Sequence, residues 1–231
     1  MNSRRIQDLL GLRYAPVAIS FVQEIPEGIS RVSKREPSAC AYWKLASTGG
    51  VFYATVEDHF GCPIGAHIQG VPLPDEPAQQ LKHTLDMMHE LGYLTPEITD
   101  HLPRLSRDWA VVVYAPLDKV ALSPDVVIFL GNARQLMVLI EAAQLAGISI
   151  LSTSGRPACG MIPTALHANG VVTNLGCIGN RVYTQIGDDE FYVAVPGTFL
   201  PEIERALPKL CEANCQLEHY HLARRVTGVG I

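Results

Sequence analysis

Four of the six cysteines stand in two pairs with similar surroundings. Cys40 and Cys159 each follow an alanine, whereas Cys62 and Cys177 each follow a glycine. The members are 62 − 40 = 22 residues apart in the first pair and 177 − 159 = 18 residues apart in the second. Four converging cysteine sulfurs are the ligand set of an iron–sulfur cluster, and the glycines would let backbone amides approach the sulfurs. The pattern therefore predicts a metal site, a 4Fe-4S cluster held by these four cysteines.

Other metal chemistries fit the sequence less well. Neither cysteine pair has the C-x₂₋₄-C spacing of zinc fingers and ribbons, and no C-x-x-C-H run for covalent haem attachment is present. His59 lies three residues before Cys62 and could act as a further ligand, or it could hydrogen-bond one of the ligands. The alternative is a loop histidine that is solvated or bound by Glu57 or Asp58.

Cys159 also allows a metal-free interpretation. Pro157 could occupy the first position of a helix, which would place Cys159 in the first turn and Arg156 close by. Helix N-termini and neighbouring cations lower the pKa of a thiol and make its thiolate nucleophilic. Under this hypothesis Cys159 is a catalytic nucleophile, with His59 or His167 as the base.

A third hypothesis is a ligand-binding module in which the cysteines are only buried apolar residues, because free cysteine often fills protein cores. For a small-molecule substrate the candidate binding residues are Arg156, Asn180 and Arg181. The two guanidinium groups could clamp a carboxylate or a phosphate. Alternatively, Arg181 pairs on the surface with the acidic residues at 188–190, a contact that adds little stability.

A second group of sulfur and imidazole side chains lies near the C-terminus: Cys211, Cys215, His219 and His221. The two cysteines are four residues apart and would share a helix face. Because Leu207 and Leu210 continue that apolar stripe, we expect the cysteines to pack in the core rather than bind metal. The sequence assigns no role to the two histidines.

Composition excludes several classes of protein. The 231 residues are 48% apolar and 18% charged with a net charge of −5, so we expect a folded chain that does not bind nucleic acid. Its longest apolar runs are shorter than the roughly 20 residues that span a membrane, and Gln7 and Asp8 interrupt the start of any signal peptide. The expected location is the cytoplasm, where structural disulfides are rare.

The hydrophobic pattern predicts an α/β or α+β fold. We expect helices at 6–12, 77–91, 133–146, 198–215 and 218–225, and strands at 16–22, 51–56, 109–115, 125–130, 148–151, 171–174 and 191–195. Strand, helix and strand over 125–151 indicate a βαβ unit, and so at least one parallel pair in a mixed sheet. The two cysteine pairs each enclose a helical segment and a strand, which predicts a pseudo-twofold internal duplication.

Several of these motifs resemble the domain of unknown function 169 family. They lie at residues 16–19, around Cys40, at 59–62, 135–142, 155–159, 176–181, 189–190 and 195–197. The resemblance implies a single domain over 1–231, in a family found largely in archaea and anaerobic bacteria, where iron–sulfur proteins are common. It includes the four paired cysteines but not Cys211 or Cys215, which supports packing for those two. The family has no assigned function, so the resemblance implies no reaction.

Overall fold

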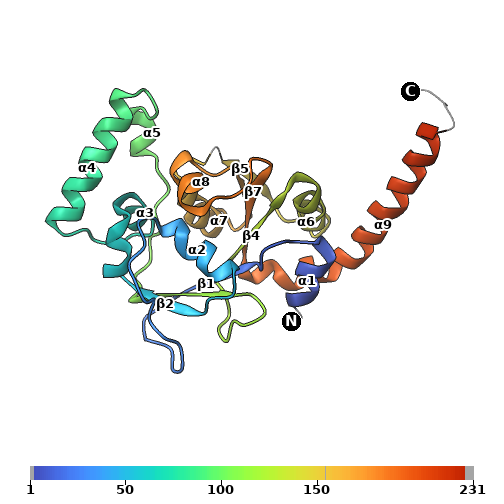
Figure 1. Ribbon diagram of the computed structural model, residues 1–231, viewed down its shortest axis with the longest axis horizontal. Coiled ribbons are helices and arrows are strands. Elements are labelled where there is room, and N and C mark those ends of the chain that lie inside the picture. Colours follow the sequence, from blue (N-terminus) through green and yellow to red (C-terminus); the bar gives the residue numbers. More distant parts are fainter. Residues whose placement is uncertain (1–2, 154, 227–231) are drawn as a thin grey trace.

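The computed structural model describes residues 3–153 and 155–226, which form a mixed sheet of seven strands covered by helices on both faces (Figure 1). The strand order is β2-β3-β1-β4-β7-β6-β5. The strands are β1 (Val17–Val22), β2 (Phe52–Thr55), β3 (Val111–Pro116), β4 (Val126–Asn132), β5 (Ile150–Thr153), β6 (Val171–Asn174) and β7 (Glu190–Pro196). All neighbouring strands are antiparallel except β5 and β6, which are parallel.

Helices of very different length connect these strands. The α-helices are α1 (Ser3–Leu10), α2 (Ala39–Ser47), α3 (Pro63–Ile68), α4 (Asp75–Glu90), α5 (Pro96–Asp100), α6 (Ala133–Leu145), α7 (Met161–Ala168), α8 (Ile178–Thr184) and α9 (Leu200–Val226). Short 3₁₀ turns are η1 (Glu57–Gly61), η2 (Ala158–Gly160) and η3 (Gly197–Phe199). None of the helices in the described ranges is both long enough and apolar enough to cross a bilayer.

Alternation along the central strands divides the core into two layers. On β4, Val126, Ile128 and Leu130 face one side, while Val127 and Phe129 face the other. The first side is covered by α2, α3 and α7 and carries Cys40 and Cys159, and the second by α1, α6 and α9. Since all seven positions of the strand except the last are buried, β4 shows the continuous apolar run of a central strand.

The pairing pattern of one half of the sheet is repeated in the other half. β1 pairs with β3 so that Val17 faces Pro116, and β4 pairs with β7 so that Val126 faces Pro196. β3 then pairs with β2, as β7 pairs with β6. The units β2-β3-β1 and β6-β7-β4 therefore match in order, direction and register, while β5 has no counterpart.

An approximate two-fold axis relates the two units. β1 and β4 are antiparallel neighbours, and Val17 faces Ile128 just as Ile19 faces Val126. Cys40 and Cys62 precede and follow β2, and Cys159 and Cys177 precede and follow β6 in the same way. The arrangement agrees with the predicted pseudo-twofold relation, and the duplication itself stays a prediction.

The mixed α/β sheet and a parallel pair are confirmed, but the parallel pair is not where the sequence pattern placed it. β4 and β5 run in the same direction across α6, yet β7 and β6 lie between them. The parallel neighbours are β5 and β6, joined through η2 and α7. Local periodicity predicts whether a segment is a strand or a helix, but it does not predict which strand pairs with which.

The two predicted C-terminal helices are one helix. α9 runs without a break through Pro208, which lies inside it, and its last turns extend away from the body (Figure 1). Only Leu200, Ile203 and Leu207 of this helix are buried. The prediction that Cys211 and Cys215 pack in the core is therefore wrong, since Cys211 is half-buried and Cys215 is exposed.

Candidate functional site

Four cysteine side chains line one cavity of about 420 Å³ on the α2–α3–α7 side of the sheet. They are the four predicted from the sequence: Cys40, Cys62, Cys159 and Cys177. The walls around them are mainly apolar and include Ile64, Met87, Met88 and Ile178. The fold thus brings together thiols that are up to 177 − 40 = 137 residues apart in the chain.

Each cysteine is placed at the start of a helical segment. Cys40 is the second residue of α2, and its backbone N–H donates to the Ser38 hydroxyl that caps this helix. Cys62 and Cys177 are the N-cap residues of α3 and α8. Cys159 is the middle residue of η2. Because the first N–H groups of a helix lack partners within the helix, this placement surrounds the sulfurs with donors.

Backbone donors do reach two of the sulfurs. The Cys177 Sγ accepts a hydrogen bond from the backbone N–H of Asn180 at 3.4 Å. Backbone groups of Ala39 and Gly65 hydrogen-bond Cys62. A Cβ at Gly65 would lie only 2.9 Å from the Cys62 sulfur, so this position has no room for a side chain.

Two glycines let the loops of Cys159 and Cys177 touch. Gly155 and Gly176 both have a positive φ, +85° and +79°. A Cβ added at Gly155 would lie 2.8–2.9 Å from backbone atoms of Gly176, closer than real Cβ contacts come. The backbone approach fixes the two loops against each other and, with them, the two cysteines that follow.

Burial favours the neutral form of three of the four thiols. It raises the pKa of Cys40, Cys62 and Cys159, and each of these pKa values is raised further by the other cysteines of the cavity. The structure offers no support for the predicted activation of Cys159: Pro157 precedes a 3₁₀ turn that leads into α7, and Cys159 is only 3% exposed. A nucleophile needs a lowered pKa, which this environment does not provide.

The three predicted substrate-binding residues have different positions. Arg156 lines the cavity at its exposed edge, where it donates to the Tyr93 carbonyl at 2.8 Å. Asn180 is buried in the wall, with its Nδ2 donating to the Tyr192 hydroxyl at 3.2 Å and its Oδ1 without a partner. Arg181 is not among the lining residues and instead donates to the carbonyl groups of Leu175, Gly187 and Glu190.

No group of three or more His, Cys, Asp or Glu side chains within 3–153 and 155–226 is arranged to hold a metal ion. A single tetrahedral zinc with sulfur at about 2.3 Å would need its ligands roughly 3.8 Å apart. The four thiols therefore share a cavity without forming a closed single-ion centre.

A family model described as uncharacterised matches residues 5–206 of the chain. The chain belongs to the domain of unknown function 169 (DUF169) family. An uncharacterized protein of Methanocaldococcus jannaschii, MJ0308, is 29% identical over 227 residues, covering 89% of this chain and 92% of the relative. No solved structure matches.

In this DUF169 chain His59 is buried beside the core, away from the residues that line the cavity. Its Nδ1 lies 2.7 Å from the Thr55 carbonyl oxygen, and its Nε2 lies 3.1 Å from the Tyr114 hydroxyl. Burial lowers the pKa of His59 to about 4. Both nitrogens are thus engaged in the core, and the structure offers no support for His59 as a ligand.

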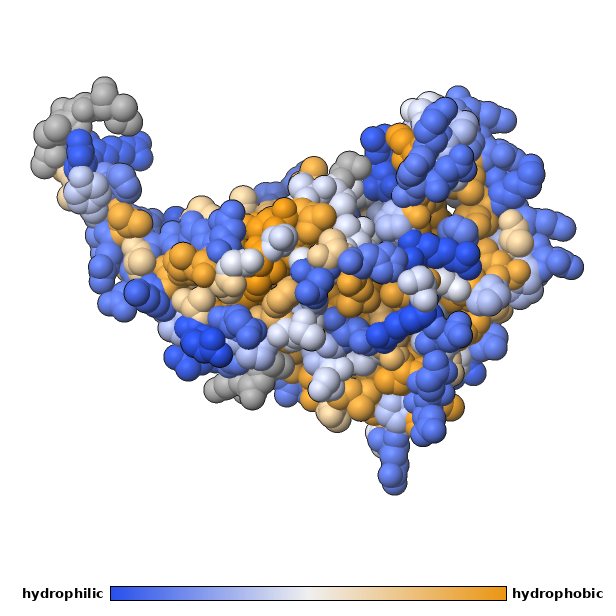
Figure 2. All heavy atoms as spheres, turned by 180° about the vertical axis from the view of Figure 1, so that it is seen from behind, coloured by the Kyte–Doolittle hydropathy of each residue, from blue (hydrophilic) through white to orange (hydrophobic). Residues whose placement is uncertain are grey.

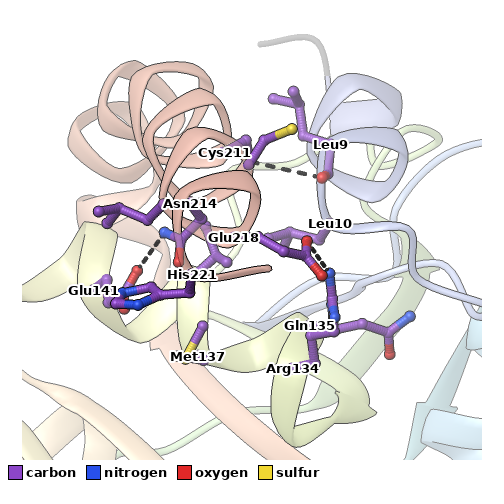
Figure 3. Close-up of a pocket in the computed structure, with 13 residues that line it drawn as sticks. Leu9, Leu10, Arg134, Gln135, Met137, Glu141, Cys211, Asn214, Glu218 and His221 are labelled. Carbon is purple, nitrogen blue, oxygen red and sulfur yellow. Dashed lines mark hydrogen bonds and ion pairs between the residues drawn. The ribbon is translucent and has the colours of Figure 1, made fainter. Parts of the chain in front are cut away.

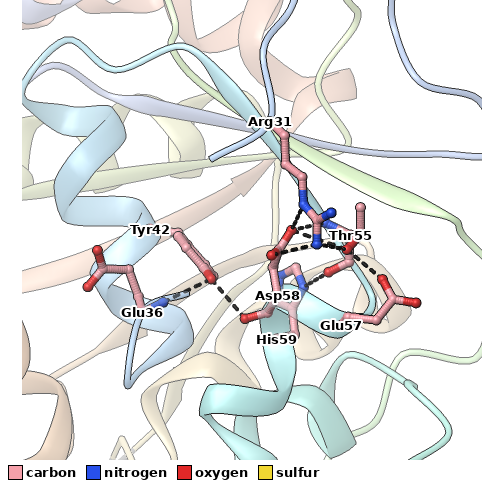
Figure 4. A network of polar contacts seen from close by, with 7 residues as sticks. All are labelled: Arg31, Glu36, Tyr42, Thr55, Glu57, Asp58 and His59. Atoms are coloured by element: carbon pink, nitrogen blue, oxygen red, sulfur yellow. Dashed lines mark hydrogen bonds and ion pairs between the residues drawn. The ribbon is translucent and has the colours of Figure 1, made fainter. Parts of the chain in front are cut away.

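A polar network fixes the turn that leads to Cys62 (Figure 4). The Asp58 carboxylate accepts from Arg31 Nε at 2.8 Å and from the Thr55 backbone N–H at 2.8 Å. The Asp58 carbonyl accepts from the Tyr42 hydroxyl of α2 at 2.8 Å. Burial disfavours the charged carboxylate, but the hydrogen bonds from Arg31 and Thr55 outweigh it and lower the pKa of Asp58.

Removing the charge of this network should loosen the turn. We expect Asp58→Asn to lower the free energy of unfolding by about 1–3 kcal/mol, because Arg31 and the Thr55 N–H lose a charged acceptor. Urea unfolding measures the change. Asp86→Asn is the matched control, since Asp86 forms an exposed ion pair with Lys82 and should have little effect. Equal effects of the two substitutions would contradict the role of the Asp58 network.

The α4 side of the cavity was missed by the sequence analysis. Residues 77–91 were predicted as an amphipathic helix, and in the structure no residue of α4 is buried while Leu91, just after it, is 74% exposed. Met87 and Met88 instead face the cysteine cavity. The periodicity that predicted the helix could not show that its apolar stripe covers a cavity.

Proposed function

We propose that this DUF169 chain binds a 4Fe-4S cluster through Cys40, Cys62, Cys159 and Cys177, and that it acts in electron transfer or in activation of a small substrate. We further propose that it works in the cytoplasm, independently of nucleic acid. The observation that carries the proposal is the shared cavity of the four thiols, which come from four separate segments.

The donor set favours a cluster over a single ion. Thiols are soft ligands suited to iron–sulfur clusters, zinc and copper(I). A cluster distributes its four cysteines over several irons, so its ligands stand farther apart than those of one ion. The cavity of about 420 Å³ offers room for this wider arrangement.

The surrounding residues have roles that follow from their positions. Metal ligation requires thiolates, so protons are released on binding and loading should be favoured by higher pH. Backbone N–H groups at Cys62 and Cys177 stabilise thiolate sulfur, and Met87 and Met88 exclude water from the cavity. When bound, the cluster supplies one-electron redox chemistry.

The substrate side of the proposal rests on Arg156 and Asn180. Arg156 stands at the open edge of the cavity, where its guanidinium could bind a carboxylate or phosphate. The buried Asn180 Oδ1, which lacks a partner, would accept a hydrogen bond from a bound N–H or O–H group. Arg181 would contribute indirectly, by holding the loops on either side of α8.

The test is anaerobic production of the full chain, with and without reconstitution, followed by iron and sulfide analysis and absorption spectroscopy. We expect about four iron and four sulfide per chain, as a 4Fe-4S cluster requires. Serine replacement of Cys40, Cys62, Cys159 or Cys177, one at a time, should remove most of the bound iron. A colourless, iron-free protein after reconstitution would contradict the proposal.

The chain supplies its own control cysteines. Cys211 and Cys215 lie on α9, outside the cysteine cavity. The variants Cys211→Ser and Cys215→Ser should therefore keep the iron and sulfide content of the unsubstituted chain. Loss of iron in all six variants would indicate adventitious binding, and loss in none would favour buried structural cysteines. Circular dichroism of each variant separates cluster loss from unfolding.

A further inference from the structure

The last part of α9 projects from the body of the protein (Figure 1). From Gln216 to Val226 every residue except Glu218 is exposed. These 226 − 215 = 11 residues would span about 16 Å. Because helices in proteins gain most of their stability from packing, an exposed helical end of this kind would gain stability from a partner surface.

Two exposed apolar residues share one face of the projecting end. Leu222 is 49% exposed and Val226 is 86% exposed, four residues apart and so on the same face. The surface of the arm mixes apolar and hydrophilic residues (Figure 2). Leu222 and Val226 therefore form an apolar pair that is suited to packing against another helix.

A groove lies beside the base of the same helix, between α1, α6 and α9 (Figure 3). Its volume is about 690 Å³, and its apolar lining includes Leu9, Leu10 and Met137. On α9 the groove is lined by Cys211, Cys215 and Glu218, among others. Steps of four and three residues continue this face from Glu218 to Leu222 and then to Arg225 and Val226. The groove and the projecting apolar face are thus one continuous seam.

The groove is lined by Arg134, Glu141 and Glu218 as well as by apolar residues, and Arg134 and Glu218 form an ion pair with each other. The tip from 219 to 226 contains two arginines and no acid. In the groove, Glu141 accepts a hydrogen bond from Asn214 at 2.8 Å, and across the described ranges neither Glu141 nor Arg225 has an ion-pair partner. A helix lying antiparallel to α9 in the groove would bring an Arg225 toward a Glu141.

We propose that the occupant of this groove is α9 of a second copy of the chain. In an antiparallel, two-fold dimer each tip lies in the other copy's groove, with Leu222 and Val226 on the apolar floor and Arg225 beside Glu141. Such an interface is self-complementary, as a two-fold axis requires. The inference does not depend on the cluster, because the groove lies on the opposite side of the sheet from the cysteines.

Light scattering after size-exclusion chromatography of the full chain tests the dimer. We expect 2 × 25.2 = 50.4 kDa for the unsubstituted protein. Leu222→Glu and Val226→Glu should each shift the mass toward one copy, since a buried unpaired carboxylate opposes association. Tyr220→Glu is the matched control, because Tyr220 is 52% exposed in the same segment but faces about 200° away from Leu222 on the helix.

A charge exchange tests the arrangement itself. Glu141→Arg and Arg225→Glu should each weaken the dimer, and the double variant should recover it, because the opposite charges face each other again. A monomer at all concentrations would overturn the inference. So would a dimer that responds to Tyr220→Glu as it does to Leu222→Glu, or a double variant weaker than either single one. Circular dichroism confirms that each variant is folded.

Discussion

Gly155→Ala is expected to cost about 2–4 kcal/mol of unfolding free energy and to separate the loops that carry Cys159 and Cys177. The alanine would have to adopt a φ of +85°, which L-residues rarely occupy. Its Cβ would lie 2.8–2.9 Å from backbone atoms of Gly176. A left-handed φ costs a non-glycine residue about 1 kcal/mol, and overpacking costs a further 1–3 kcal/mol. Since the contact is with backbone rather than with a flexible side chain, one loop must move.

Gly147→Ala separates these two causes. Gly147 has a φ of +73°, but a Cβ added there meets nothing within 4 Å. This control should cost only the conformational strain, about 1 kcal/mol. Urea unfolding of both variants gives the difference, which measures the close approach of the loops. Equal losses would show that the contact of Gly155 with Gly176 does not constrain the structure.

The Gly155→Ala variant also has a readout at the cysteine cavity. If the loops of Cys159 and Cys177 must stay in register for ligation, the variant should bind less iron than Gly147→Ala at a temperature where both are folded. If the cysteines are only buried apolar residues, the two variants should differ in stability alone. The comparison therefore tests the geometry of the proposed site without altering a sulfur.

The grouping of the four cysteines was predictable because the signal was local at each position. An alanine or glycine before each cysteine repeated in two places, and the structure brings all four side chains to one cavity. The short helices α3 and α8 were not predicted, since six- and seven-residue helices carry little periodicity. Their N-cap cysteines could have served as a signal only if cysteine were a usual capping residue, which it is not.

Long-range packing accounts for most of what could not be predicted. Strands were predicted correctly at 125–130 and 148–151. However, β5 pairs with β6 rather than with β4, because the antiparallel pairing of β4 with β7 is longer and more buried. Similarly, the stripe on α9 predicted core packing for Cys211 and Cys215, although the core ends at Leu207. An amphipathic pattern specifies a face but not the surface that covers it.

The approximate two-fold axis of the sheet explains why the cysteines meet. β2 and β6 are equivalent in the pairing pattern, and each is preceded and followed by cysteine-bearing turns on the same side of the sheet. Cys40 and Cys159, which come before these strands, are both buried in that layer. A symmetric sheet can therefore assemble four ligands from two similar segments, without any short cysteine motif.

Stability is expected to fall on acidification as His59 becomes protonated. The folded pKa of about 4 lies below the unfolded value of about 6.5, because burial disfavours the charged ring. The unfolded chain therefore binds the proton first. The contribution of neutral His59 to the free energy of unfolding should be fully present above pH 6.5. It should decrease by about 3 kcal/mol as the pH falls toward 4.

The pH dependence can be assigned to His59 by comparing two substitutions. His59→Gln removes the titrating group, so its unfolding free energy, although lower at pH 7, should change less between pH 7 and 4.5 than that of the unsubstituted chain. His83→Gln, at an exposed position of α4, should keep the full dependence. The same slope in both variants would place the titration elsewhere. Because His59 contacts Tyr114 on β3 and the Thr55 carbonyl at the end of β2, its protonation would perturb the segment that leads to Cys62.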